Sequence, residues 1–128
     1  MSYSYDDQNI FARIIRGEIP CKKVLETEHA LAFHDIQPQA PVHVLVIPKG
    51  RYVNADHFGS AASEAEAAGL ARAIAEAARL TGVAEAAGGK GFRLIANTGE
   101  NGRQDVPHYH LHILGGEKLG RMLPQRGD

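Results

Sequence analysis

Three histidines alternate with other residues in the segment PHYHLHILGG: His108, His110 and His112. Successive side chains of a β-strand point to opposite faces, so these three rings would share one face at intervals of roughly 7 Å. The residues between them would then face the core. A fourth histidine, His43, stands in a second strand-like segment, PVHVLVIP. The spacing predicts a cluster of imidazoles on one face of a sheet.

The chemistry of such a cluster depends on the central ring. Imidazole has an ordinary pKa of about 6.5, so near neutral pH it can act as nucleophile, acid or hydrogen-bond donor. A ring with one nitrogen fixed by a hydrogen bond presents the other nitrogen to an electrophile. Phosphoryl and nucleotidyl groups suit this arrangement, because their oxygens accept hydrogen bonds and an amine leaving group must take up a proton. We therefore predict that His110 attacks a phosphorus atom and carries a covalent intermediate.

The same histidines have two other interpretations, as core residues or as metal ligands. A single buried histidine is often only a satisfied core residue, but three in alternation would leave several ring nitrogens without partners. Histidine pairs on strands also bind zinc or iron, usually with a further histidine or carboxylate ligand. His43 or one of the downstream acids could supply that ligand. The residues alone therefore leave a metal site open.

The segments that would position these residues are short, rich in apolar or β-branched side chains, and bounded by turn residues. Such segments are typical of strands. The expected strands are residues 23–26, 30–34, 42–47, 92–96 and 108–114.

Two helices are expected beside the strands. In the alanine-rich stretch 61–87, apolar residues recur at three-and-four spacing, Ser63 and Glu66 resemble a capping box, and Gly82 supplies a stop. An earlier short helix would have Asp7 as its cap, an apolar face, and terminators at Gly17 and Pro20. Its apolar face would consist of Ile10, Phe11, Ile14 and Ile15. Together these elements predict an α+β domain with a five-stranded, largely antiparallel sheet and two helices.

Length and composition limit the classes of function. The 128 residues predict a single domain, 1–128, with one core. Lys and Arg number 14 against 15 Asp and Glu, so neither nucleic acid nor an anionic membrane is expected as the main partner. Cys21 is the single cysteine, which excludes an internal disulfide. The start MSYSYDDQN has no signal-peptide pattern and no apolar stretch is long enough to span a bilayer, so we expect a cytoplasmic protein.

The histidine run and its surroundings resemble the histidine triad superfamily. His108-Tyr109-His110-Leu111-His112 has the alternating histidine and hydrophobic pattern of that superfamily. The segments IFARIIRGEIP, LAFHDIQPQAPVHVLVIPKG and NTGENGRQDVPHYHLHILGG are similar, in the same order, to those of its Hint branch, the purine nucleoside phosphoramidases. The tail GGEKLGRMLP is similar to that of bacterial members.

The resemblance implies a mechanism and a role for each histidine. His110 matches the nucleophile, which would attack the α-phosphorus of a nucleoside 5′-phosphoramidate, release the amine and leave a nucleotidyl-histidine for water to hydrolyse. His112 and His43 match residues that donate to the phosphate and help to protonate the leaving group. His108 matches the supporting histidine beside the nucleophile. The family mechanism needs no metal and no other cofactor, which weakens the metal interpretation.

The resemblance also implies how a purine nucleotide, an AMP or GMP conjugate, would bind. Asp35 matches the carboxylate that accepts hydrogen bonds from both ribose hydroxyls. Asn97 and the backbone around Gln104, Asp105 and Val106 match contacts to the phosphate or the leaving group. The residues that match the apolar wall around the base are Ile10, Phe11, Phe33, His34 and Ile36. Family members of this branch are homodimers with joined sheets, and we expect the same here.

Some positions depart from the family pattern. Asp105 stands where eukaryotic members commonly carry serine, and a carboxylate there would repel a phosphate or meet a cationic part of the leaving group. Pro107 replaces a large residue, and the tryptophan near the C-terminus of some members is absent. Cleavage of dinucleoside polyphosphates and nucleotide binding with little turnover therefore stay as alternative functions.

Overall fold

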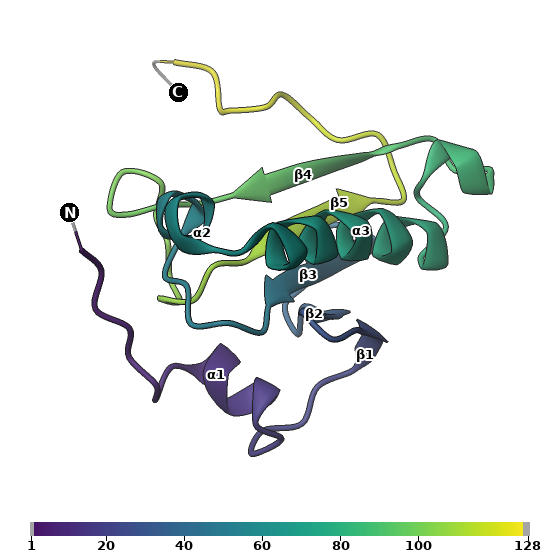
Figure 1. Ribbon diagram of the computed structural model, residues 1–128. Helices are drawn as coiled ribbons and strands as arrows, with labels where there is room; N and C mark the ends of the chain where they lie inside the picture. The colour runs from purple at the N-terminus through teal and green to yellow at the C-terminus, as the bar shows by residue number, and fades with distance from the viewer. Residues whose placement is uncertain (1, 127–128) are drawn as a thin grey trace.

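The computed structural model describes residues 2–126, in which helices cover both faces of one sheet (Figure 1). Along the chain the elements come in the order α1, β1, β2, β3, α2, α3, η1, β4, β5. The helices are α1 (Ile10–Ile15), α2 (Ala55–Ala61), α3 (Glu64–Leu80) and the 3₁₀ turn η1 (Glu85–Ala87). The strands are β1 (Lys23–Glu26), β2 (Ala30–His34), β3 (Val42–Pro48), β4 (Phe92–Ala96) and β5 (Leu111–Gly115).

The sheet has the strand order β1-β2-β3-β5-β4, and every neighbouring pair is antiparallel. The predicted α+β class with a five-stranded antiparallel sheet is therefore confirmed. β3 and β5 are neighbours, and Leu45 is paired with His112. This pairing brings the two histidine-bearing segments together although 69 residues separate His43 from His112.

The two faces of the sheet carry different side chains. α3 packs mainly over β1, β2 and β3 on one face, which we call the α3 face. Its buried strand residues are Ala30, Ala32, Val44, Val46, Leu111 and Ile113. The opposite face, which we call the histidine face, carries a smaller cluster of Leu31, Phe33, Leu45 and Ile47 against Phe11 of α1. The alternation predicted for residues 108–113 is thus observed in its apolar half, since Leu111 and Ile113 lie in the core of the α3 face.

The long helix α3 begins and ends as its sequence predicts. The Ser63 side chain accepts from the Glu66 N–H at 3.1 Å, and the Glu66 carboxylate accepts from the Ser63 N–H at 3.0 Å. This reciprocal pair satisfies two N–H groups that the first turn leaves free. Gly82, with φ +80°, follows the C-cap Thr81 in the left-handed conformation that glycine adopts without a steric penalty.

The cap predicted for α1 is wrong. Asn9, not Asp7, is the N-cap, because its Oδ1 accepts from the Ala12 N–H at 2.9 Å. Asp7 instead pairs with Arg51, whose Nε lies 3.0 Å from its carboxylate. Asp7 therefore pairs with a residue 44 positions away and does not cap the helix.

The expectation of two helices is also wrong, because α2 and the turn η1 were not predicted. α2 has only seven residues, ADHFGSA, and only Phe58 of them is buried, so it offers no long apolar period. Its signal was the cap Asn54, whose side chain accepts from the His57 N–H at 2.9 Å.

The last strand starts later than predicted, at Leu111 rather than His108. The ladder between β3 and β5 ends with the pair Val46 and Leu111. Beyond it, the Tyr109 N–H donates to the Tyr52 carbonyl at 2.8 Å. His108 and His110 therefore stand in a segment just before β5, and β3 runs one residue further than predicted, to Pro48.

A membrane-spanning helix is not found in the part of the chain that the structure describes, because none of its helices is long and apolar enough.

Candidate active site

His108 is completely buried and both of its ring nitrogens have partners. Nε2 lies 2.8 Å from the Pro48 carbonyl oxygen, and Nδ1 lies 2.6 Å from the Tyr5 hydroxyl. A carbonyl oxygen only accepts, so Nε2 carries the proton and Nδ1 accepts from Tyr5. Burial lowers the pKa of His108 to about 4, so the ring is neutral near pH 7.

His110, the predicted nucleophile, is fixed by a similar backbone contact. Its Nδ1 lies 2.7 Å from the His108 carbonyl oxygen and must therefore carry the proton. In this tautomer Nε2 keeps a bare lone pair. Phe11 packs edge-on against the ring, with centroids 4.9 Å apart, and the residue is 2% exposed. The ring is held in one orientation with one nitrogen free to form a bond.

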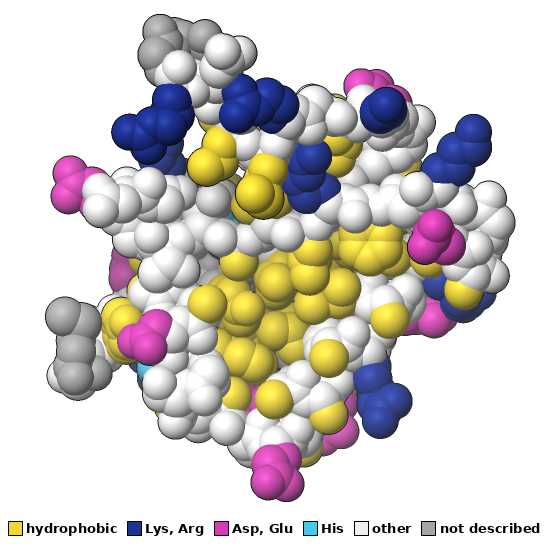
Figure 2. Space-filling model, turned by 90° about the horizontal axis from the view of Figure 1, so that it is seen from above, with side chains coloured by type: hydrophobic (Ala, Val, Ile, Leu, Met, Phe, Trp, Pro, Cys, Tyr) yellow, Lys and Arg dark blue, Asp and Glu magenta, His cyan; other side chains and the backbone are white. Residues whose placement is uncertain are grey.

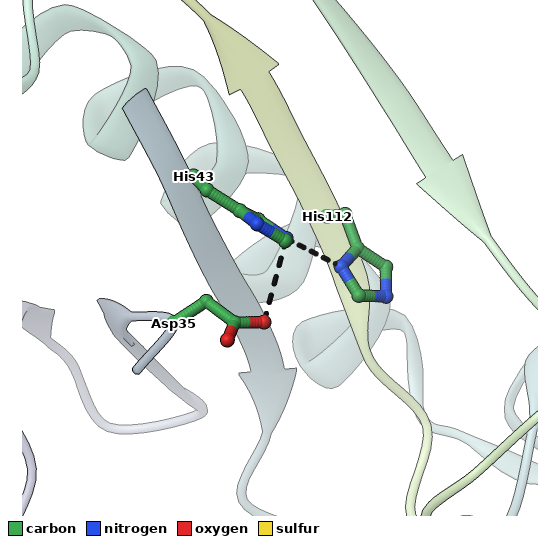
Figure 3. A group of neighbouring side chains, drawn as sticks. All are labelled: Asp35, His43 and His112. Carbon is green, nitrogen blue, oxygen red and sulfur yellow. Dashed lines mark hydrogen bonds and ion pairs between the residues drawn. The ribbon is translucent and has the colours of Figure 1, made fainter. Parts of the chain in front are cut away.

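His112 and His43 form a hydrogen-bonded pair across β3 and β5. His43 Nε2 lies 2.9 Å from His112 Nδ1, and the His112 and His110 ring centroids are 5.2 Å apart. Figure 3 shows the two rings extending from neighbouring strands toward each other. Burial lowers the pKa of His112 to about 4 and also lowers the pKa of His43, against the opposing effect of Asp35. Both rings are therefore neutral near pH 7.

The backbone assigns the protons in this pair. The Gln39 N–H donates to His43 Nδ1 at 3.0 Å, so the neutral His43 ring carries its proton on Nε2. His43 Nε2–H then donates to His112 Nδ1, and the proton of the neutral His112 ring lies on Nε2. The pair therefore has a direction, from Gln39 through His43 to a free N–H on His112.

Asp35, His43 and His112 also form the group whose ligand atoms could surround a metal, all lying within 4.8 Å of one another (Figure 3). Two contacts disfavour that use. A metal on His43 Nε2 would move the ring proton to Nδ1, directly against the Gln39 N–H. In addition, two nitrogens on one tetrahedral zinc stand roughly 3.3 Å apart, whereas these are at a hydrogen-bond distance of 2.9 Å. The expectation of no metal stays a prediction, which the Gln39 amide favours.

Asp35 lies just after β2 with its carboxylate directed at the histidine pair. Oδ2 is 3.4 Å from His43 Nε2, and Oδ1 accepts from the Gln37 N–H at 2.8 Å. The carboxylate is 20% exposed, so one side of it still meets solvent. An oxygen atom at this place can accept a hydrogen bond from a ligand beside the triad.

The predicted base-binding residues differ in position and exposure. Phe11 and Phe33 are buried together on the histidine face, with ring centroids 5.6 Å apart. Ile36 is 91% exposed and Ile10 is 44% exposed, so each offers free apolar surface. His34 is exposed and is paired with Val44 of the α3 face, so strand alternation directs it away from Phe33. Its predicted place beside the base is not supported by this register.

The loop between β4 and β5 contains the remaining predicted contacts. Gln104 uses its side chain inside the protein, where Nε2 donates to the Val53 carbonyl at 2.6 Å and to the Val106 carbonyl at 3.0 Å. Val106 packs against the apolar cluster of the histidine face. Asn97 directly follows β4 and is half-buried. Gln104 thus fixes the loop, and its own N–H donates to the Gly99 carbonyl at 3.0 Å. The expected backbone contacts of Asp105 and Val106 to a ligand stay a prediction.

Asp105 lies beside His110, the predicted nucleophile. Its Oδ1 lies 3.5 Å from His110 Nε2, although the side chain is 81% exposed. The carboxylate therefore stands where an incoming phosphorus would have to approach that nitrogen. Its exposed position leaves it free to turn toward solvent when an anionic group arrives.

Two residues of this arrangement were missed from the sequence. The sequence around Tyr5 indicates no role for it, yet its hydroxyl contacts His108 across 103 residues of sequence. Gln39 acts through its backbone N–H, which no side-chain pattern can reveal. The turn residues that surround Gln39 gave only a general signal that the backbone there is free of sheet bonding.

Comparisons with known proteins agree with this geometry. The HIT domain family model matches residues 16–119. A 13.2 kDa HIT-like protein of Azospirillum brasilense is 60% identical over 123 residues, which cover 96% of this chain and 98% of the relative. The purine nucleoside phosphoramidase of Escherichia coli is 42% identical over 124 residues, which cover 94% of this chain and 98% of the relative.

Solved structures give the same family. A HIT family hydrolase from Clostridium thermocellum has a TM-score of 0.78 at 37% identity, and the match covers 92% of this chain and 99% of that one. A histidine triad protein from Clostridium difficile has a TM-score of 0.77 at 36% identity, with coverage of 92% and 98%.

Proposed function

Because this chain belongs to the HIT domain family, we propose that it cleaves purine nucleoside 5′-phosphoramidates through a covalent nucleotidyl intermediate on His110. One observation carries the proposal. The His108 carbonyl accepts a hydrogen bond from the Nδ1–H of His110 at 2.7 Å. This contact holds the ring in place and leaves Nε2 bare. The name of the Escherichia coli relative, purine nucleoside phosphoramidase, supports the choice of substrate.

The reaction then has two steps. In the first, His110 Nε2 bonds to the α-phosphorus, the P–N bond breaks, and the leaving nitrogen departs as an amine after taking up one proton from the solvent. The Nε2–H of His112 donates a hydrogen bond to the phosphoryl group or the leaving nitrogen. In the second step water bonds to phosphorus, the bond to His110 breaks, and the water loses one proton to the solvent, which balances the proton taken up by the amine. His43 keeps His112 in the donating tautomer through the 2.9 Å contact.

The nucleotide would lie between Asp35 and the β4–β5 loop. Asp35 accepts from the ribose hydroxyls, and the exposed side chains of Ile10 and Ile36 give apolar surface for a purine. Backbone N–H groups around Asp105 and Val106 donate to the phosphate. The Asp105 carboxylate repels the phosphate and favours a leaving group with a positive charge.

We also propose that two copies of the chain pair through β4. This strand is at the edge of the sheet, and α3 packs mainly over β1, β2 and β3. Phe92 and Leu94 are therefore 39% and 44% exposed on the α3 face. Figure 2 shows hydrophobic side chains gathered over the side of the molecule where β4 lies. A free strand edge beside an apolar surface gains stability when a second copy covers both.

Light scattering after gel filtration tests this pairing. The Leu94→Glu variant should elute as a monomer where the wild-type protein elutes as a dimer. Ile36→Glu introduces the same charge at an exposed apolar residue outside β4 and should leave the dimer intact. A monomeric wild-type protein would overturn the pairing.

The covalent step is tested by rapid mixing with an adenosine 5′-phosphoramidate, acid quench and mass spectrometry. An adduct of one AMP on His110 is expected within the first turnover. Diadenosine polyphosphates serve as the comparison substrate, and faster cleavage of these would assign the chain to polyphosphate hydrolysis instead. Nucleotide binding with neither adduct nor turnover would favour a purely regulatory binding protein.

A further inference from the structure

The N-terminal segment runs across the molecule to the buried end of the triad. Figure 1 shows it descending along the left side of the molecule to the start of α1. Tyr3 donates to the Asp56 carboxylate of α2 at 2.5 Å and stacks on His57, with ring centroids 5.0 Å apart. Asp7 pairs with Arg51 at 3.0 Å. The segment is therefore attached to the rest of the fold on both sides of Tyr5.

Tyr5 lies between these attachments and faces His108. Its hydroxyl is 2.6 Å from His108 Nδ1, and the rings meet edge-on with centroids 5.6 Å apart. The Arg51 guanidinium lies 5.3 Å from the centroid of the Tyr5 ring. The family match begins at residue 16, so Tyr5 lies outside the region that the HIT domain model describes.

The Tyr5 hydroxyl is the second hydrogen-bond partner of a ring that has no access to water. His108 is 0% exposed, and the Pro48 carbonyl accepts its Nε2 proton. The lone pair on Nδ1 then needs a donor, which the Tyr5 hydroxyl supplies. Without it, a buried nitrogen would lack a partner, and the ring would gain from rotating or exchanging its proton. All buried side-chain nitrogen and oxygen atoms within residues 2–126 have a hydrogen-bond partner, so the network has no spare donor waiting inside.

His108 is also the residue whose carbonyl holds the nucleophile. The same residue that Tyr5 and Pro48 fix through its ring accepts the Nδ1 proton of His110 through its backbone at 2.7 Å. We propose that Tyr5 is a positioning residue for the triad, whose hydroxyl, together with the Pro48 carbonyl, holds the His108 ring in place in the Nε2–H tautomer and thereby keeps the His108 carbonyl on His110 Nδ1. The inference rests on the proposed role of His110 as nucleophile.

The variant Tyr5→Phe removes the hydroxyl and keeps the ring. We expect its kcat for an adenosine 5′-phosphoramidate to fall by about threefold to tenfold, the loss expected for one hydrogen bond, with KM changed by less than about twofold. Tyr3→Phe is the matched control, because it removes a hydroxyl from the same segment without touching His108. It should keep the wild-type kcat.

Long-range ¹H–¹⁵N spectra provide a readout that loss of stability alone would not change. In the wild-type protein His108 should show a protonated Nε2 and a bare Nδ1. In Tyr5→Phe the His108 Nδ1 signal should shift, and the Nδ1 proton of His110 should exchange faster with water. Wild-type His108 protonated on Nδ1 would overturn the inference even if the variant failed to fold. Equal losses of kcat in both variants, or an unchanged Tyr5→Phe, would also overturn it.

The spectra separate this inference from the proposed function. A wild-type protein that does not cleave phosphoramidates would remove the proposed function, yet the tautomer of His108 and its dependence on Tyr5 would still be measured. Turnover with an AMP adduct on His110 but no effect of Tyr5→Phe would leave the function intact and remove only the positioning role.

Discussion

On the α3 face, β3 and β5 present Val44, Val46, Leu111 and Ile113, each at most 7% exposed and packed beneath a long helix. On the histidine face the same two strands present polar rings, and the covering helix, α1, has only six residues. The first face is closed by apolar contact alone. The second must satisfy a polar nitrogen for each ring it buries, and therefore depends on hydrogen bonds of defined direction.

The anchors on the histidine face are mostly backbone groups. The Pro48 carbonyl holds His108, the His108 carbonyl holds His110, and the Gln39 N–H holds His43. A backbone group moves only with the fold, so each ring inherits its orientation from the sheet and the loops around it. The α3 face therefore supplies the stability on which the orientation of the rings depends.

The largest effect on activity is expected from His110→Ala on the histidine face. It removes the nitrogen that we propose as the nucleophile and should lower kcat by at least about a thousandfold, because no other group replaces the covalent step. AMP binding should change little, since the bond to phosphorus forms only during the reaction. Single-turnover kinetics and calorimetric titration with AMP measure the two effects. Retention of turnover by this variant would eliminate the covalent mechanism.

The opposite result, a loss of stability with kcat retained, is expected from Ile113→Ala on the α3 face. Ile113 is 0% exposed, so truncation leaves a cavity and should lower the free energy of unfolding by about 3 kcal/mol. Below the unfolding transition, kcat should stay within about twofold of the wild-type value. Urea unfolding and steady-state kinetics check the pair of results. A loss of kcat as large as that of His110→Ala would contradict the division of the faces.

Lowering the pH below 6.5 should weaken the histidine face. Burial lowers the pKa of His108 from 6.5 to about 4, so between these values the unfolded chain binds a proton that the folded chain does not. The free energy of unfolding should therefore be full above pH 6.5 and fall by about 3 kcal/mol as the pH is lowered to about 4. His112, whose pKa is also lowered to about 4, acts in the same direction.

Urea unfolding at several pH values measures this slope. His108→Gln should make it shallower, because only His112 then contributes. His34→Gln, at an exposed histidine, removes no buried imidazole and should leave the slope unchanged. A wild-type slope of zero between pH 4 and pH 6.5 would show that the rings are not buried in the neutral form.

The α3 face was largely predictable from the sequence, because its information is local. β1, β2 and β4 have the predicted bounds, and Ser63 and Glu66 form the predicted capping box. The failure was α2, whose seven residues carry too short an apolar pattern to compete with a loop.

The histidine face was predictable in its residue types and not in its contacts. The alternation of His108, His110 and His112 indicated imidazole chemistry, but the start of β5 depends on where β3 ends, at Pro48. The contact of Tyr5 with His108 spans 103 residues, and that of His43 with His112 spans 69. No local period encodes such pairs, so the direction of each hydrogen bond required the three-dimensional arrangement.

The smallest effect is expected from the charge of Asp105, which lies beside His110, the proposed nucleophile. Asp105 Oδ1 lies 3.5 Å from His110 Nε2, so a bound phosphate meets a like charge that Asp105→Asn would remove. We expect AMP affinity to rise by about threefold at low salt and by less at high salt, because the side chain is exposed and screened. The preference for a phosphoramidate with a cationic amine over a neutral one should fall by a similar factor. Glu100→Gln changes the charge of the same loop at an exposed residue and should alter neither quantity. Unchanged affinity and preference in Asp105→Asn would mean that the carboxylate turns fully into solvent when nucleotide binds, and that the backbone alone faces the phosphate.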